Sequence, residues 1–159
     1  MARHFTFRPI DVFRDRQTII DFRKDSYIVS FGTPEELGDE DMYVAWMAMA
    51  ASMYPKGFVI MEYKGVPVGQ IELEMIVYEG RPIGYVDLFY LIPEFRGKGY
   101  GKIQIDYAEN YFKNKRLSEY HLRVSPTNKR ALRFYEKHGM KPMMTEYLTQ
   151  KVIRMRKQL

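Results

Sequence analysis

A chain of 159 residues with ordinary apolar and charged fractions is most simply one soluble domain, and we expect a single domain over residues 1–159. It has no cysteine, which excludes disulfides, thiolate metal sites and a cysteine nucleophile, and its longest apolar stretch is too short to span a membrane, so we expect a cytoplasmic protein. The net charge of +5 is uneven: residues 1–80 hold 8 Lys and Arg against 13 Asp and Glu, whereas residues 81–159 hold 17 against 7, so the halves suit partners of opposite charge.

The first half of the chain predicts two helical regions among four strands. Period-two alternation and turn residues indicate the strands, and caps with helical spacing indicate the helices. In the second helical region Thr33 is the candidate cap and Pro34 the first helical residue. The expected ranges are strand 4–10, helix 11–27, helical region 33–53, and strands 57–63, 68–80 and 82–92.

The second half predicts a helix, a strand, a helix and two strands. Thr127 is the candidate cap of the second of these helices, and Gly139 its left-handed stop. The strand that ends at Ile92 is expected to cross over through the first helix to a parallel strand, which makes the sheet mixed. The expected ranges are helix 101–116, strand 119–125, helix 127–140, and strands 143–148 and 150–157.

The stretch "PEFRGKGYGK", residues 93–102, lies at the end of a predicted strand and the start of a predicted helix. Unpaired N–H groups and the dipole at a helix N-terminus favour anions, and glycines let the backbone close around them. Arg96, Lys98 and Lys102 would add positive charge. The stretch therefore predicts a phosphate cradle.

Three glycine signatures compete for this loop. The dinucleotide fingerprint G-x-G-x-x-G lacks its last glycine, and the phosphate-loop pattern lacks Ser or Thr after Lys102. The pattern R-x-x-G-x-[GA] is satisfied by Arg96, Gly99 and Gly101.

With "LFYLIPEFRGKGYG" at 88–101 and "VSPTNKRALRFYEKHGM" at 124–140, the chain resembles the GCN5-related N-acetyltransferase (GNAT) family, which transfers an acyl group from acetyl-coenzyme A to an amine. The resemblance covers residues 85–142. It implies an α+β fold, a mixed, mostly antiparallel sheet of six to seven strands with helices on both faces. It also implies acetyl-coenzyme A as co-substrate, no metal, an amine-bearing acceptor, and a monomer or homodimer.

The resemblance also implies roles for individual residues. The main chain of Phe89, Tyr90 and Leu91 would pair with the pantetheine arm, Asn128 would bond this arm, and Tyr135 would lie near the thioester sulfur. The loop amides that would hold the pyrophosphate are those of Arg96, Gly97, Lys98, Gly99, Tyr100, Gly101 and Lys102. The spacing of the second motif agrees, because residues seven apart lie on one helix face, and the small Ala131 between them leaves room for a ligand.

Acetyl transfer needs a route for the amine proton, a donor to the oxyanion and an acid for the leaving thiolate. The resemblance implies a backbone N–H near Leu91 as the donor, and we expect Tyr135 to be the acid. Arg123 stands where some family members carry a glutamate base, so Asp87 is our candidate base, with His121 or a water relay as alternatives.

The resulting hypothesis is an N-acetyltransferase that works by direct attack in a ternary complex. A coenzyme-binding or sensing module of the same fold is the alternative, motivated by the missing glutamate. The basic half alone suggests a nucleic-acid-binding domain, but no nucleic-acid motif supports it, and we expect neither a nucleic-acid nor a membrane partner. Polyamine, aminoglycoside, amino-acid and protein amines all remain open as acceptors.

Overall fold

The computed structural model describes residues 4–159, so the first three residues of the predicted domain lie outside the description. Within this range seven strands form one sheet in the order β1-β2-β3-β4-β5-β7-β6. The strands are β1 (Phe5–Pro9), β2 (Phe58–Tyr63), β3 (Val66–Tyr78), β4 (Arg81–Leu91), β5 (Glu119–Val124), β6 (Lys141–Tyr147) and β7 (Lys151–Gln158). Every described pair of neighbours is antiparallel except β4 with β5. The predicted mixed, mostly antiparallel sheet is confirmed.

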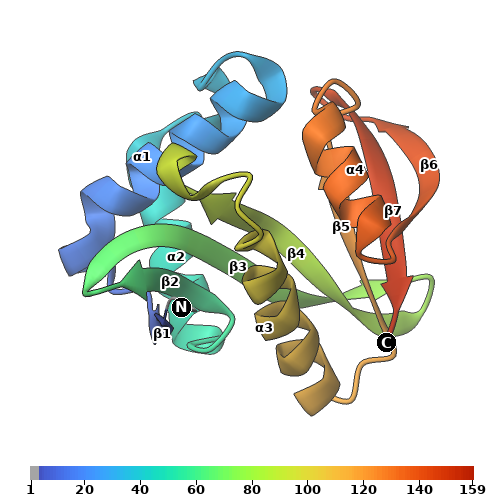
Figure 1. Cartoon of the computed structure of the whole chain (residues 1–159), viewed down its shortest axis with the longest axis horizontal. Coiled ribbons are helices and arrows are strands. Elements are labelled where there is room, and N and C mark those ends of the chain that lie inside the picture. Colours follow the sequence, from blue (N-terminus) through green and yellow to red (C-terminus); the bar gives the residue numbers. More distant parts are fainter. Residues whose placement is uncertain (1–3) are drawn as a thin grey trace.

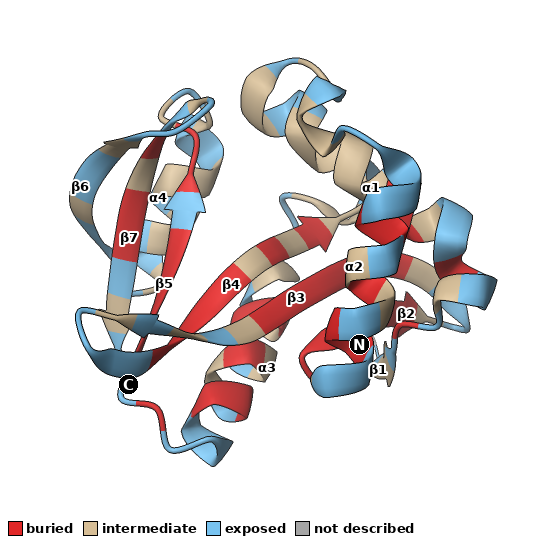
Figure 2. Cartoon of the chain, turned by 180° about the vertical axis from the view of Figure 1, so that it is seen from behind, coloured by how far each residue is buried: buried red, intermediate tan, exposed pale blue. Residues whose placement is uncertain are grey.

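The helices lie on both faces of this sheet, as expected (Figure 1). One face carries α1 and α2, and the other carries α3 and α4 (Figure 2). The helices are α1 (Val12–Phe31), α2 (Glu40–Met53), α3 (Gly101–Asn114) and α4 (Lys129–Lys137), with one-turn 3₁₀ helices at Glu35–Leu37 and Pro93–Phe95. Because α3 joins β4 to its parallel neighbour β5, the predicted crossover is also confirmed.

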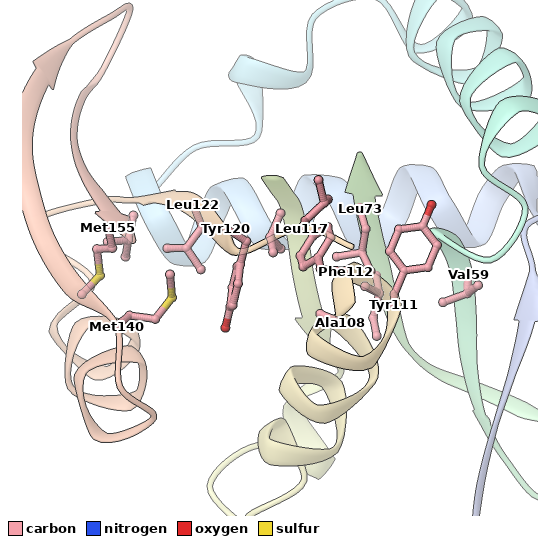
Figure 3. Packing of buried hydrophobic residues seen from close by; sticks show 13 residues of the cluster. Val59, Leu73, Ala108, Tyr111, Phe112, Leu117, Tyr120, Leu122, Met140 and Met155 are labelled. Atoms are coloured by element: carbon pink, nitrogen blue, oxygen red, sulfur yellow. The ribbon is translucent and has the colours of Figure 1, made fainter. Parts of the chain in front are cut away.

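Each face of the sheet has its own apolar core. On the α3 face, Ala108 and Phe112 of α3 are buried against strand residues such as Leu73 and Leu122 (Figure 3). On the other face, Ile19 of α1 and Met47 of α2 are fully buried over β2. The two cores hold the helices rigidly on the sheet, and this rigidity positions the site described below.

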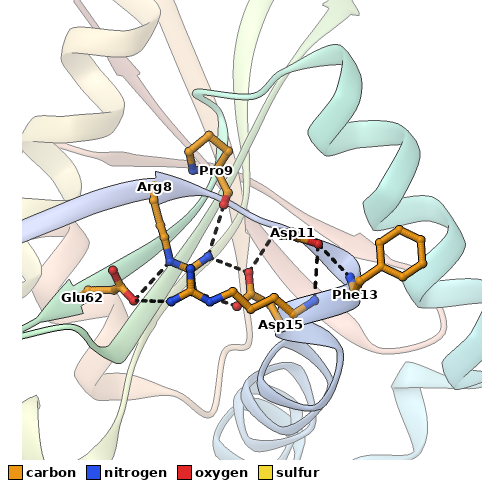
Figure 4. A network of polar contacts seen from close by, with 7 residues as sticks. Arg8, Pro9, Asp11, Phe13, Asp15 and Glu62 are labelled. Carbon is orange, nitrogen blue, oxygen red and sulfur yellow. Dashed lines mark hydrogen bonds and ion pairs between the residues drawn. The ribbon is translucent and has the colours of Figure 1, made fainter.

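The start of α1 is fixed by a polar network (Figure 4). The Asp11 carboxylate accepts hydrogen bonds from the N–H groups of Phe13 and Arg14, which caps the helix. Arg8 of β1 donates to both carboxylate oxygens of the buried Asp15 at 2.8 Å, and its Nε lies 3.1 Å from Glu62 of β2. The network therefore ties α1 to the edge of the sheet.

The predicted helical region 33–53 is wrong at its start. The structure extends α1 to Phe31, ends it at the left-handed Gly32 with φ of 79°, and begins α2 only at Glu40. Asp39 caps α2 by accepting from the N–H of Met42. Thr33 and Pro34 precede only a single 3₁₀ turn, because the following Gly38 has φ of 69° and interrupts the helix.

The predicted cap of α4 is also wrong. Asn128, and not Thr127, caps this helix by accepting from the N–H of Ala131 at 3.2 Å. The Thr127 hydroxyl instead bonds Ser125 at 2.8 Å. The expected stop is confirmed, since Gly139 has φ of 92° directly after the helix.

Candidate active site

The sheet splits beyond the middle of β4. Strands β4 and β5 pair only through Gly84–Val86 and Tyr120–Leu122 and then diverge (Figures 1 and 2). The N–H of Ile92 donates to the carbonyl of Val68 on β3 at 2.9 Å. Because peptide groups alternate in direction along an antiparallel strand, those of Phe89 and Leu91 face away from β3. The split therefore leaves an open strand edge at these two residues.

A β-bulge lies at the point where the split begins. Glu72 of β3 pairs with Leu88 and Leu73 pairs with Val86, so Asp87 has no partner residue on β3. The carbonyl of Asp87 accepts a hydrogen bond from Arg23 of α1 at 3.1 Å. The bulge thus redirects the Asp87 side chain and docks α1 onto the strand edge.

A pocket of about 420 Å³ lies between α1, the diverging strands and α4. Its walls combine charged, aromatic and small residues, with Tyr27 of α1 on one side and Ala131 of α4 on the other. Predicted site residues that the structure brings together around it are Asp87, Phe89, Tyr90, Leu91, Arg96, Asn128 and Tyr135. The loop residues 97–102 do not line this pocket; they follow β4 after the one-turn 3₁₀ helix Pro93–Phe95.

The glycine loop holds its backbone in conformations that glycine alone adopts easily. Gly97 and Gly99 have φ of 71° and 85°, and a Cβ on Gly101 would lie 2.7 Å from the Phe134 ring of α4. The helix α3 starts here without a side-chain cap. Among residues 4–159, no hydrogen-bond acceptor is recorded for the N–H groups of residues 97–99, 101 and 102. The loop therefore offers free donors at a helix N-terminus, which is the chemistry of an anion site.

Arg96, the first residue of the predicted cradle, uses both its N–H group and its guanidinium for hydrogen bonds within the protein. The N–H of Arg96 donates to the carbonyl of Pro93, and its guanidinium donates to the Leu91 carbonyl at 2.8 Å and to Asp25 of α1 at 2.7 Å. Asp25 also accepts from the Tyr90 hydroxyl. Burial alone would raise the pKa of Asp25, but these hydrogen bonds from Tyr90 and Arg96 outweigh it and hold the pKa below its usual value. Arg96 thus braces the loop against α1.

Asn128, which caps α4, and Tyr135 within α4 both face the pocket, as the spacing predicted. Asn128 uses its carbonyl oxygen for the helix cap, which leaves its amide N–H groups for a ligand. The Tyr135 ring lies 6.4 Å from that of Phe89, and no hydrogen bond of its hydroxyl to another described residue is recorded. Burial raises the pKa of Tyr135, so the phenol is protonated near neutral pH.

Asp87 is half-buried and lies in a group of acidic side chains. Burial raises the pKa of its carboxyl first, and a hydrogen bond with Glu74 and the charge of Glu72 raise it further. Its Oδ2 is buried without a hydrogen-bond partner among the described residues. Glu72 accepts from Tyr43 of α2 at 3.0 Å, and Arg23 supplies the nearby positive charge. The wall of the pocket therefore includes the protonated carboxyl of Asp87, and Glu72 and Glu74 lie near it without lining the pocket.

The two β5 residues considered for proton transfer have different surroundings. Arg123 lines the pocket and is paired with Glu146 at 2.9 Å. His121 is fully buried between Glu119 at 2.7 Å and Arg154 at 2.9 Å, and it does not line the pocket. Desolvation lowers the pKa of His121, so the ring is neutral. The alternative base His121 therefore has no access to this pocket.

Sequence reasoning missed Arg23, Asp25 and Glu74, which all reach the site through tertiary contacts. Asp25 and Arg96 are distant in the chain, and nothing in the local pattern of α1 marks Asp25. Glu74 belongs to an alternating strand, where a polar residue normally indicates a solvated face. No signal in a single sequence would have identified them.

The sequence profile described as "Acetyltransferase (GNAT) family" matches residues 17–140, most of the chain. The chain belongs to the GNAT acetyltransferase family. The predicted family is thereby confirmed. A search of curated protein sequences finds no match.

Solved structures share this fold at low sequence identity. Ard1 from Thermoplasma volcanium has a TM-score of 0.76 at 19% identity, covering 98% of this chain and 97% of that one. The PaiA N-acetyltransferase from Thermoplasma acidophilum has a TM-score of 0.70 at 21% identity, covering 98% and 99%. Spermidine N-acetyltransferase from Vibrio cholerae has a TM-score of 0.74 at 21% identity, covering 97% and 95%.

Two further features of residues 4–159 bear on other functions. None of their helices combines the length and the apolar character that a membrane span requires. The same residues contain no group of three or more His, Cys, Asp or Glu side chains arranged to hold a metal ion.

Proposed function

We propose that the chain transfers the acetyl group of acetyl-coenzyme A to a primary amine by direct attack in a ternary complex. The observation that carries the proposal is the convergence of three features: the open edge at Phe89 and Leu91, the free amides of the glycine loop, and the Tyr135 hydroxyl. Crystals of the Thermoplasma acidophilum and Vibrio cholerae proteins contain coenzyme A, which supports this use of the fold.

The open strand edge would bind the pantetheine arm as an additional strand. Phe89 and Leu91 supply the outward peptide groups, and the Leu91 carbonyl is already taken by Arg96. The N–H of Leu91 would then face the thioester carbonyl oxygen and stabilise the oxyanion. Tyr90 directs its carbonyl to Gln104 at 2.7 Å, so we assign its side chain, and not its main chain, to the site.

In the reaction, the neutral amine nitrogen forms a bond with the thioester carbon, and the carbon–sulfur bond breaks. Tyr135 donates its proton to the departing thiolate. Burial raises the pKa of the phenol and so keeps it protonated until this step, although the same burial makes it a weaker acid. The amine proton leaves through Asp87 and its neighbour Glu74, or through water. Because the raised pKa keeps Asp87 protonated near pH 7, we assign the accepting role to the pair and not to Asp87 alone.

The acceptor is an amine that enters on the α1 side of the pocket. Arg23, Arg96 and Arg123 are each balanced by an acid, whereas Asp87 lies beside a second carboxyl. Because the buried Oδ2 of Asp87 has no hydrogen-bond partner among the described residues, an amine that donates a hydrogen bond suits this wall. The Vibrio cholerae protein was crystallised with spermine. Another structure of the same fold, the NatC complex, was crystallised with a peptide, so both polyamines and peptides belong in the test.

Calorimetric titration with acetyl-coenzyme A, NAD and ATP tests the binding step. We expect selective binding of acetyl-coenzyme A that is lost in Gly99→Glu, because Gly99 has φ of 85° in the cradle. Gly80→Glu is the matched control, since Gly80 has φ of 80° and open space in the β3–β4 turn. No binding to the folded protein, or equal loss in both variants, would overturn the cradle.

Acetyl transfer to a panel of polyamine, amino acid, aminoglycoside and peptide amines tests the catalytic step. Arg123 in place of a carboxylate favours the alternative, a coenzyme-binding or sensing module without catalysis. We expect coenzyme release that depends on an amine and that falls in Tyr135→Phe. Tight coenzyme binding with no transfer to any amine would decide for the sensing module.

A further inference from the structure

Arg130 of α4 lies against the glycine loop, although no motif marks it. A Cβ placed on Gly97 would collide with the Arg130 guanidinium, so this group touches the loop at its first glycine. Arg130 is exposed, and no hydrogen bond or ion pair to another described residue is recorded for it. A guanidinium without a protein partner therefore lies beside amides without an acceptor.

The three cations expected to serve the loop are all engaged elsewhere. Arg96 pairs with Asp25, and the Lys98 ammonium donates to the carbonyl of Glu94 at 2.7 Å. Lys102 pairs with Asp106 one turn along α3 at 2.8 Å. These contacts direct the loop's own positive charges away from its free N–H groups.

We propose that Arg130 is the cation that binds the pyrophosphate of the coenzyme, closing over it from α4 while the amides from Gly97 onwards hold it from α3. A guanidinium suits this position because its planar fork forms paired hydrogen bonds to phosphate oxygens, which a lysine ammonium does not reproduce. Arg96 is then a positioning residue that shapes the loop. This inference rests on the proposed coenzyme site and adds to it the residue that neutralises the ligand.

The geometry favours the pyrophosphate over the 3′-phosphate of the same coenzyme. Gly97 is where the free amides begin, and Arg130 contacts the loop at this residue. Both anions belong to one ligand, so the test must separate them. Coenzyme A that lacks the 3′-phosphate retains the pyrophosphate and provides this separation.

The test is calorimetric titration of the full chain with coenzyme A and with its 3′-dephospho form at two salt concentrations. For Arg130→Ala we expect about 10-fold weaker binding of both ligands, which is the loss of one charge-assisted contact, and a shallower salt dependence. Arg130→Lys should recover part of this loss. Lys113→Ala is the control. It also removes one exposed positive charge, but Lys113 lies about 18 Å along α3 from Gly101, at the opposite end of the helix from the loop.

The possible outcomes are distinct. No binding by the unmodified chain would refute the coenzyme site itself. Normal binding by Arg130→Ala, or a loss equal to that of Lys113→Ala, would refute the role of Arg130 alone. A loss restricted to the ligand with the 3′-phosphate would also overturn the proposal and move Arg130 to that phosphate. Since Arg130 is exposed, its variants should fold, and an unchanged melting temperature will verify this.

Discussion

The carboxylate of Asp25 connects three parts of the site, and replacing Asp25 with Ala should reveal its contribution. Its Oδ2 accepts from the Tyr90 hydroxyl of β4 at 2.5 Å and from Arg96 of the loop at 2.7 Å. The substitution leaves Arg96 without its counter-charge while its side chain is only 26% exposed. We therefore expect a loss of folding free energy and a weaker hold on the loop.

The magnitude follows from the exposure of the pair. Hydrogen bonds to charged groups contribute about 1.5–3 kcal/mol when buried, whereas exposed ion pairs contribute about 0–1 kcal/mol. The Asp25 and Arg96 side chains are 33% and 26% exposed, so we place the two lost contacts together at about 2 kcal/mol. In a chain of this length, this lowers the melting temperature by about 4–8 °C.

Urea unfolding at pH 7 measures the difference, with Asp21→Ala as the control. Asp21 is exposed on the same helix and accepts a hydrogen bond from Gln17 alone among the described residues, so its removal should change the free energy of unfolding by less than about 0.5 kcal/mol. Equal stabilities of the Asp25 and Asp21 variants would refute the proposed brace.

The pH dependence provides a second check on Asp25. Its folded-state pKa lies below that of the unfolded chain, so its contribution is complete above about pH 4 and is lost as the pH falls through the folded pKa. The difference in the free energy of unfolding between the natural protein and the Asp25→Asn variant should therefore become smaller as the pH falls. A difference that stays constant from pH 7 to pH 3 would show that charge is not the cause.

Three further substitutions test the site. Tyr135→Phe should leave the free energy of unfolding unchanged, because the hydroxyl has no recorded hydrogen bond to another described residue. The same substitution should lower the rate of acetyl transfer about 100-fold. An unchanged rate would show that Tyr135 is not the acid. Gly101→Ala should lower the free energy of unfolding by about 1–3 kcal/mol through overlap with Phe134, measured by urea unfolding, and a variant as stable as the natural protein would contradict the packing. The raised pKa of Asp87 means that this carboxyl increasingly destabilises the folded protein as the pH rises above about 4. At pH 8 the Asp87→Asn variant should therefore have a free energy of unfolding about 1 kcal/mol or more above that of the natural protein, while its rate of acetyl transfer falls. A variant that is less stable than the natural protein at pH 8 would contradict this.

Local sequence was sufficient for the glycine loop and the elements around it. Gly97 and Gly99 adopt the positive φ angles that their residue type permits, and the strand and helix on either side lie where periodicity predicted them. Tyr135 faces the pocket with Asn128 because helical spacing alone places residues seven apart on one side. These features depend on neighbours in the chain.

Helix ends were predicted less well, because several residues competed for each cap. Asn128 and Thr127 are both suitable caps, but the Thr127 hydroxyl is hydrogen-bonded to Ser125, two residues earlier in the chain. Thr33 and Asp39 were likewise both suitable caps, and the positive φ of Gly38 separates the 3₁₀ turn from α2, which begins only after Asp39. Small differences in local hydrogen bonding determine which of two suitable residues caps a helix, and these hydrogen bonds exist only in the folded chain.

The sequence by itself determined the family, the order of the elements and the glycine-rich backbone of the loop at the start of α3, because these depend on periodicity, glycine conformation and helix ends. Only the tertiary structure decided where the charges go. It turned Arg96 towards Asp25, placed the Arg130 guanidinium against Gly97, and brought the half-buried Asp87 close to Glu74. Electrostatic interactions depend on distance and burial in space, and neither can be read from separation along the chain.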